Sequence, residues 1–247
     1  MNINDLVLAN TAKTYLGLNS NTQSTSGVGS AVQTGLQKAE KRIQSQVDVT
    51  SAQLSSFGKL TSSVSGVQLA AHSLASLPAA STSTAVKTAA DGFVSAFNSA
   101  INAAKTTAAV PGESAASRSA GRVAKDLIRT VSENSETIDS LKKIGFSLQS
   151  DGTLTLDAKK FDAAQKADPS SVKATLAKIG QQVDKTATQE LASAGNVSNS
   201  MASLSQRAAV LKSQQSAIAA LQQGSTTNQN SSYPTYGGFG LGSYQGY

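Results

Sequence analysis

The chain has no cysteine, no tryptophan and a single histidine, and each shortage excludes a class of site. Without cysteine there is no disulfide framework, no thiolate zinc site and no cysteine nucleophile. With one histidine, no site built from two or more histidines exists. That residue, His72, falls within a predicted helix and has no partner that the sequence identifies. We therefore interpret it as a packing or surface residue.

Apolar and aromatic residues are also scarce, at 39% and 4% of the chain. This composition cannot fill a thick globular core, but it suits the thin seam of a coiled coil, where small residues let helices approach closely. No apolar run reaches the roughly 18 residues of a membrane-spanning helix. The first residues lack a basic segment followed by an apolar core, so we expect no cleaved signal peptide and no membrane insertion.

The net charge of +6 is spread along the chain. Its densest cluster is Lys38, Lys41 and Arg42. A basic balance can indicate a nucleic-acid partner, but no aromatic residues lie among these cations to stack on bases. We interpret the charges as solvated helix faces and expect no nucleic-acid partner.

Catalytic and ligand-binding patterns are missing as well. Four aspartates are close in sequence, but they do not form a calcium-binding loop. There is no G-x-S-x-G turn, and the G-V-G of residues 27–29 lacks the strand and spacing of a phosphate loop. The sequence predicts no catalytic residue, no cofactor and no metal site, which indicates a structural or assembly protein.

A β-hairpin is the clearest local feature. Two short alternating runs, at residues 144–149 and 153–157, flank a turn that contains Asp151 and Gly152. The Asp-Gly pair is a strong hairpin signal because both residues tolerate positive φ. We predict one β-hairpin over about 144–157.

Two helix starts follow the hairpin. Asp157 is expected to cap a helix over residues 158–167. Asp168 is expected to cap the next one, with Pro169 at its first position. Together with the hairpin, these helices predict a small α+β head.

Two long helical stripes flank this head. Apolar residues recur every 3, 4 or 7 positions from residue 36 to 77 and again from 181 to 223, where Glu190 interrupts the register. Two stripes of equal length suggest antiparallel coiled-coil arms, and we expect self-assembly to complete their thin seam. The residues predicted for this assembly seam are Ile43, Val47, Leu54, Phe57, Val64, Val67, Leu74, Val183, Val197, Met201, Leu204, Leu211 and Ile218.

The predicted fold is therefore mainly α, with two long antiparallel coiled-coil arms and a small α+β head. We divide the chain into a mobile segment at 1–30, an arm at 31–78, a head at 79–180, an arm at 181–223 and a Gly/Tyr-rich tail at 224–247. Within the head, helices are expected over 85–106 and 120–141.

Several of these stretches resemble one known family. Residues 141–157 read LKKIGFSLQSDGTLTLD and are followed by a short helix and D-P-S-S-V. The pattern resembles the C-terminal region of the flagellar hook-associated protein 2 family, the bacterial filament cap proteins. Residues 93–98 (FVSAFN), 123–131 and 51–60 (SAQLSSFGKL) are similar to a helix, the segment before the hairpin and an N-terminal coiled-coil segment of that family.

The resemblance implies an extracellular axial protein of the bacterial flagellum, exported without a cleaved signal peptide. It implies a homo-oligomer at the filament tip that promotes insertion of flagellin, with itself, flagellin or other axial proteins as partners. The large outer domains usual in this family are absent, because only residues 78–84 separate the first arm from the FVSAFN helix. An alternative is therefore a subunit of a self-polymerising extracellular filament built from a reduced cap-like fold.

Overall fold

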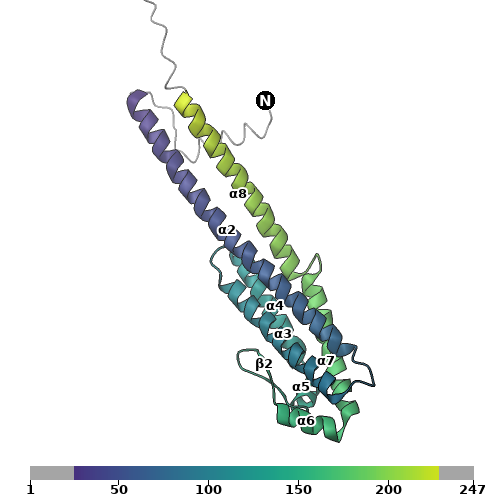
Figure 1. Cartoon of the computed structure of the whole chain (residues 1–247). Helices are drawn as coiled ribbons and strands as arrows, with labels where there is room; N and C mark the ends of the chain where they lie inside the picture. The colour runs from purple at the N-terminus through teal and green to yellow at the C-terminus, as the bar shows by residue number, and fades with distance from the viewer. Residues whose placement is uncertain (1–24, 228–247) are drawn as a thin grey trace, which may run out of the picture. The chain divides into compact units, whose positions relative to one another are not determined.

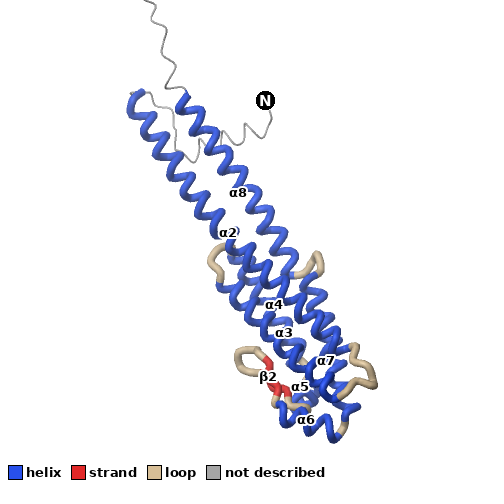
Figure 2. Tube along the Cα trace, viewed as in Figure 1, coloured by secondary structure: helices blue, strands red, loops and turns tan. Residues whose placement is uncertain are grey.

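The computed structural model describes residues 25–227, with side chains described from 31 to 223. Residues 1–24 of the predicted mobile segment and residues 228–247 of the tail lie outside this range. The described elements are α2 (Thr25–Ala75), α3 (Ser83–Ala109), α4 (Ser114–Ser132), α5 (Ser135–Lys143), β1 (Phe146–Leu148), β2 (Leu154–Leu156), α6 (Ala158–Ala167), α7 (Pro169–Leu191) and α8 (Asn196–Thr227). The mainly helical fold with one hairpin is confirmed (Figures 1 and 2).

The chain divides into two units. One comprises residues 45–211, and the other comprises residues 1–44 with 212–247. Helices α2 and α8 each contribute to both units. No helix among the described residues is long and apolar enough to cross a membrane.

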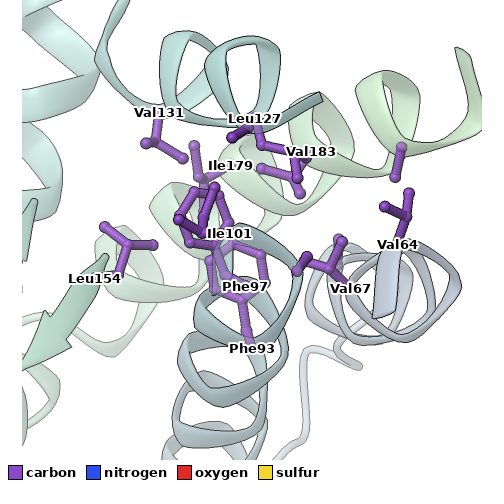
Figure 3. Packing of buried hydrophobic residues seen from close by; sticks show 14 of the residues in the cluster. Val64, Val67, Phe93, Phe97, Ile101, Leu127, Val131, Leu154, Ile179 and Val183 are labelled. Atoms are coloured by element: carbon purple, nitrogen blue, oxygen red, sulfur yellow. The ribbon is translucent and has the colours of Figure 1, made fainter. Parts of the chain in front are cut away.

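The hydrophobic core of residues 45–211 is built from one stripe of each helix. In α3, apolar residues recur at helical spacing from Val86 to Ala104 and are almost completely buried. α3 packs against α4, and α4 packs against α7. Figure 3 shows Phe97 and Ile101 of α3 among residues of α2, α4 and α7. Phe93 and Phe97 have their ring centroids 6.0 Å apart and anchor this packing.

The hairpin is docked onto this helical core. β1 and β2 are antiparallel, and Phe146 pairs with Leu156. Gly152 in the turn has φ 81°, a left-handed conformation that favours glycine. The Asn98 side chain of α3 accepts a hydrogen bond from Leu154 N (2.7 Å) and donates one to Leu154 O (2.8 Å). The amide of Asn98 thus acts as a neighbouring strand for one residue of β2.

Both helix starts after the hairpin lie where the sequence places them. The Asp157 side chain accepts hydrogen bonds from the N–H groups of Lys159 and Lys160, and Asp168 accepts one from Ser171 N. These bonds satisfy N–H groups that have no partner within the first turn of a helix.

Four predicted boundaries differ from the structure. α2 begins at Thr25, within the segment predicted at 1–30, and ends at Ala75, within the arm predicted at 31–78. The helix predicted over 120–141 is two helices, separated at residues 133–134. The predicted arm at 181–223 is also divided, because α7 ends at Leu191 and α8 starts at Asn196.

The unit outside residues 45–211 contains a pair of antiparallel helical segments, residues 25–44 of α2 and 212–227 of α8, here called the α2–α8 pair. Gln215 donates a hydrogen bond to Gln44 Oε1 (2.8 Å), and Gln222 donates one to Glu40 Oε2 (3.0 Å). As the residue number rises on α8 it falls on α2, so the two segments are antiparallel.

Candidate assembly site in the α2–α8 pair

The structure divides the predicted seam residues into two groups. Eight of them are buried within residues 45–211: Phe57, Val64, Val67, Leu74, Val183, Val197, Leu204 and Leu211. A second copy of the folded chain cannot contact these side chains. The five that keep exposed area are Ile43, Val47, Leu54, Met201 and Ile218.

Because these side chains are buried within one chain, a charged substitution there tests the folding of the subunit and not its assembly. Leu204 belongs to the hydrophobic core of residues 45–211. A charge in place of Leu204 would therefore unfold the subunit itself, because a buried unpaired charge costs several kcal/mol. Positions with exposed apolar area are needed to test assembly.

The α2–α8 pair offers such positions. The two glutamine hydrogen bonds bracket Ile43 and Ile218, which lie at the same level of the pair and are each partly exposed. Leu36 is the buried large hydrophobic residue of the described part of this pair. Leu221, one turn after Ile218, keeps 50% of its surface exposed. Two helices alone therefore leave part of this apolar stripe uncovered.

Polar groups share the same seam. Glutamine and glutamate side chains bridge the two helices along its exposed edge. Lys38, Lys41 and Arg42 are exposed on the α2 segment. The pair is thus amphipathic, with a cationic outer face and a partly exposed apolar stripe.

The head residues singled out from the sequence have structural roles in the hairpin turn. The Asp151 side chain accepts hydrogen bonds from Thr153 Oγ1 (2.6 Å) and Thr153 N (3.0 Å). These bonds, the hydroxyl bond first, hold the pKa of Asp151 below its usual range. Lys105 of α3 also donates to the Asp151 carbonyl oxygen. A Cβ at Gly152 would lie 2.3 Å from Ile128 Cδ1, so the turn is packed closely against α4.

His72 has a partner that the sequence did not identify. Its Nδ1 lies 3.4 Å from Asp184 Oδ2 of α7, and the histidine side chain is largely exposed. This is a surface contact between α2 and α7. Among residues 25–227, no group of three or more His, Asp or Glu side chains could hold a metal ion.

Glu190 is the one charged residue among those buried in the described chain, and the sequence indicated it only as an interruption of the heptads. Asn196 donates hydrogen bonds to both of its carboxylate oxygens, at 3.1 and 3.0 Å. Burial raises the pKa of the Glu190 carboxyl, the Asn196 bond opposes this, and Asp126 of α4 raises it further. Glu190 of α7 thus interacts with Asp126 of α4 and with Asn196 at the start of α8.

Comparison with known protein families identifies the family of this chain. A model of the flagellar hook-associated protein 2 C-terminus matches residues 61–234, more than half of the chain. The chain belongs to the flagellar hook-associated protein 2 family. No curated protein and no solved structure matches it significantly.

Membership in the hook-associated protein 2 family makes the chain a relative of structural flagellar proteins, which are not enzymes. The matched region begins within α2 and contains all of α3 to α8. Two of the features that carried the resemblance, the FVSAFN helix and the D-G hairpin, meet at the Asn98–Leu154 hydrogen bonds. The local patterns therefore correspond to one tertiary contact.

Proposed function

We propose that this protein is a structural component of the bacterial flagellum of the filament cap or hook-associated type. In this proposal it is an extracellular protein that forms a homo-oligomer at the filament tip and promotes insertion of flagellin. The observation that carries the proposal is the match to the hook-associated protein 2 C-terminus over residues 61–234.

The α2–α8 pair is the proposed contact between copies. Most apolar residues of the helices within residues 45–211 are buried in one core, whereas Ile218 and Leu221 of the pair keep exposed apolar area. Burying such area against equivalent helices of other subunits stabilises an assembly by about 25 cal/mol per Å². Of the five predicted seam residues that keep exposed area, Ile43 and Ile218 lie in this pair and are candidates for the contact.

A second function is supported by one specific feature. α2 ends at Ala75 and α3 begins at Ser83, so only a short linker lies where the family's large outer domains would be inserted. A member without these domains fits a subunit of a self-polymerising extracellular filament. The two functions predict different assemblies.

Electron microscopy of the purified full chain over a concentration series, with light scattering on the same samples, tests both functions. Closed rings that bind flagellin in co-sedimentation are expected for the cap function. Long regular filaments formed without flagellin would replace it with the filament function. A monomer at every concentration that also fails to bind flagellin would contradict both.

Leu221→Asp tests the contact surface. A charge at this half-exposed position is expected to prevent assembly without lowering the midpoint of thermal unfolding of the monomer. Leu69→Asp is the matched control, because Leu69 is 68% exposed on α2 within residues 45–211. Normal assembly of Leu221→Asp, or loss of assembly only in Leu69→Asp, would place the contact elsewhere.

A further inference from the structure

A column of polar side chains runs along the contact between α4 and α7. Asp126 and Thr130 are one turn apart on α4, and Gln182, Thr186 and Glu190 follow at the same spacing on α7. Because the two helices are antiparallel, Thr130 faces Thr186 and Asp126 faces Glu190. The α4–α7 contact therefore carries polar pairs at successive turns, beside the apolar stripe that fills the core.

The side chains of Thr130 and Thr186 contact each other directly. Thr130 Oγ1 and Thr186 Oγ1 lie 2.7 Å apart, and either hydroxyl can donate. The hydroxyl that accepts this bond is free to donate its own hydrogen to a carbonyl of its own helix, either Thr130 to Asp126 O or Thr186 to Gln182 O. This pair fixes the register of α4 against α7.

The pair of Asp126 and Glu190 is different because both side chains are acids. Glu190 is only 5% exposed and receives two hydrogen bonds from Asn196, at the first position of α8. The protonated Glu190 carboxyl can donate a hydrogen bond to the Asp126 carboxylate. Without that proton, two negative charges face each other across the helix contact, and one of them is buried.

The next position on α7 leaves polar atoms without partners. Gln182 Oε1 is buried and has no hydrogen-bond partner within the described residues. The same is true of Thr137 Oγ1 on α5, a helix that also packs against α7. Unpaired buried polar atoms cost free energy, so the polar column stabilises the α4–α7 contact less than apolar packing would.

We propose that the α4–α7 contact is a proton-sensitive joint, closed when Asp126 and Glu190 share a proton and loosened when both are ionised. The joint reaches α8 through Asn196, which bonds both Glu190 oxygens. It therefore couples the protonation of one buried carboxyl to the corner between α7 and α8.

The groups around Glu190 determine the direction of the effect. Asp126 on α4 is the charged group that acts on Glu190 within the described residues, and α8 contributes the neutral Asn196. Burial and the Asp126 charge favour the protonated form, so the folded chain binds this proton more tightly than the unfolded chain. The resulting stabilisation is complete below the ordinary glutamate pKa of about 4.3 and is lost as pH rises through the raised value.

The backbone between α7 and α8 indicates where the loosening would begin. Gly195 N donates to Ala192 O (2.7 Å), and a Cβ at Gly195 would lie 2.2 Å from Glu190 O. The turn between the helices is thus packed directly on the residue that carries the proton. Opening is expected at residues 188–199 before it reaches the rest of the core.

Amide hydrogen exchange of the full chain between pH 4 and pH 8, corrected for the intrinsic pH dependence of exchange, tests the joint. In the wild type, protection at residues 188–199 is expected to fall with rising pH relative to the centre of α3. Each pKa unit that separates folded and unfolded Glu190 changes the opening equilibrium by about tenfold. Glu190→Gln should remove this pH dependence, and Asp126→Asn should reduce it, because burial of Glu190 is the larger cause and remains.

Glu136→Gln is the control, since Glu136 is an exposed acid on α5. It should retain the wild-type pH dependence. Equal pH dependence at residues 188–199 in wild type, Glu190→Gln and Asp126→Asn would overturn the proposal. If Glu190→Gln does not fold, the comparison of Asp126→Asn with the wild type decides. Asp126 is partly exposed, and the asparagine side chain of this variant places no charge opposite Glu190.

Discussion

Gly180 of α7 lies against the backbone of α2, and Gly180→Ala tests this contact. A Cβ at this position would lie 2.6 Å from Ala71 O and 2.8 Å from Ala75 N. Both are backbone atoms, which cannot rotate away. Because ordinary contact begins at 3.4 Å, the two helices would have to separate by the difference between 3.4 and 2.6 Å, or about 0.8 Å.

The expected magnitude combines two opposing terms. Alanine favours a helix interior by about 1 kcal/mol relative to glycine. Overpacking of a tight contact costs about 1–3 kcal/mol, and here it also disturbs the apolar packing around Ala71. We expect net destabilisation of roughly 1–2 kcal/mol, which lowers the midpoint of thermal unfolding by about 2–8 °C for a chain of this size.

Gly92→Ala makes the same chemical change without the clash. Gly92 lies within α3, and a Cβ there would meet no heavy atom within 4 Å. This variant should gain about 0.5–1 kcal/mol of stability. Urea and thermal unfolding of both variants, followed by circular dichroism, give the comparison.

The two variants are expected to change the stability in opposite directions. If Gly180→Ala is stabilised as much as Gly92→Ala, then α2 and α7 do not approach each other as closely as described. Destabilisation of both variants would instead mean that glycine is needed in these helices for a reason other than contact distance.

Two further changes test the docking of the hairpin, and a third tests the cap of α6. Asn98→Ala leaves Leu154 N and O without partners and should cost about 1–3 kcal/mol in urea unfolding, with the largest chemical-shift changes in β2; shifts confined to α3 would argue against docking through this amide. Gly152→Ala forces a Cβ against Ile128 at a positive φ and should destabilise more than Asn98→Ala in the same assay, an order that a loose turn would reverse. Asp157→Ala removes the cap of α6 and should cost about 1 kcal/mol, which Asp157→Asn should largely restore.

Local chemistry made the hairpin and the helix starts predictable. The Asp-Gly turn, the Asp157 cap and the Asp168-Pro169 start each depend on a few neighbouring residues, and the structure places a turn or a helix start at each. The family assignment also depended on this local pattern. These predictions needed no knowledge of what packs against the segment.

The helix break at residues 192–195 was missed because the heptad pattern continues through it. Apolar residues repeat in register on both sides, and Gly195 is the local signal of the turn. The structure adds what the pattern lacks, since Gly195 lies against the backbone of Glu190. The break at residues 133–134 was missed for the same reason, although Asn134 caps α5 with a hydrogen bond from Glu136 N.

By itself, the sequence determined that the chain is mainly helical, where the hairpin turns and which family it belongs to, because these follow from local patterns. A stripe of apolar residues shows that a helix face is covered but not by what. Only the tertiary structure decided that Phe57, Leu204 and their neighbours are covered within one chain. It alone brought Asp126 beside Glu190, since residues distant in sequence meet only when α4 and α7 pack together.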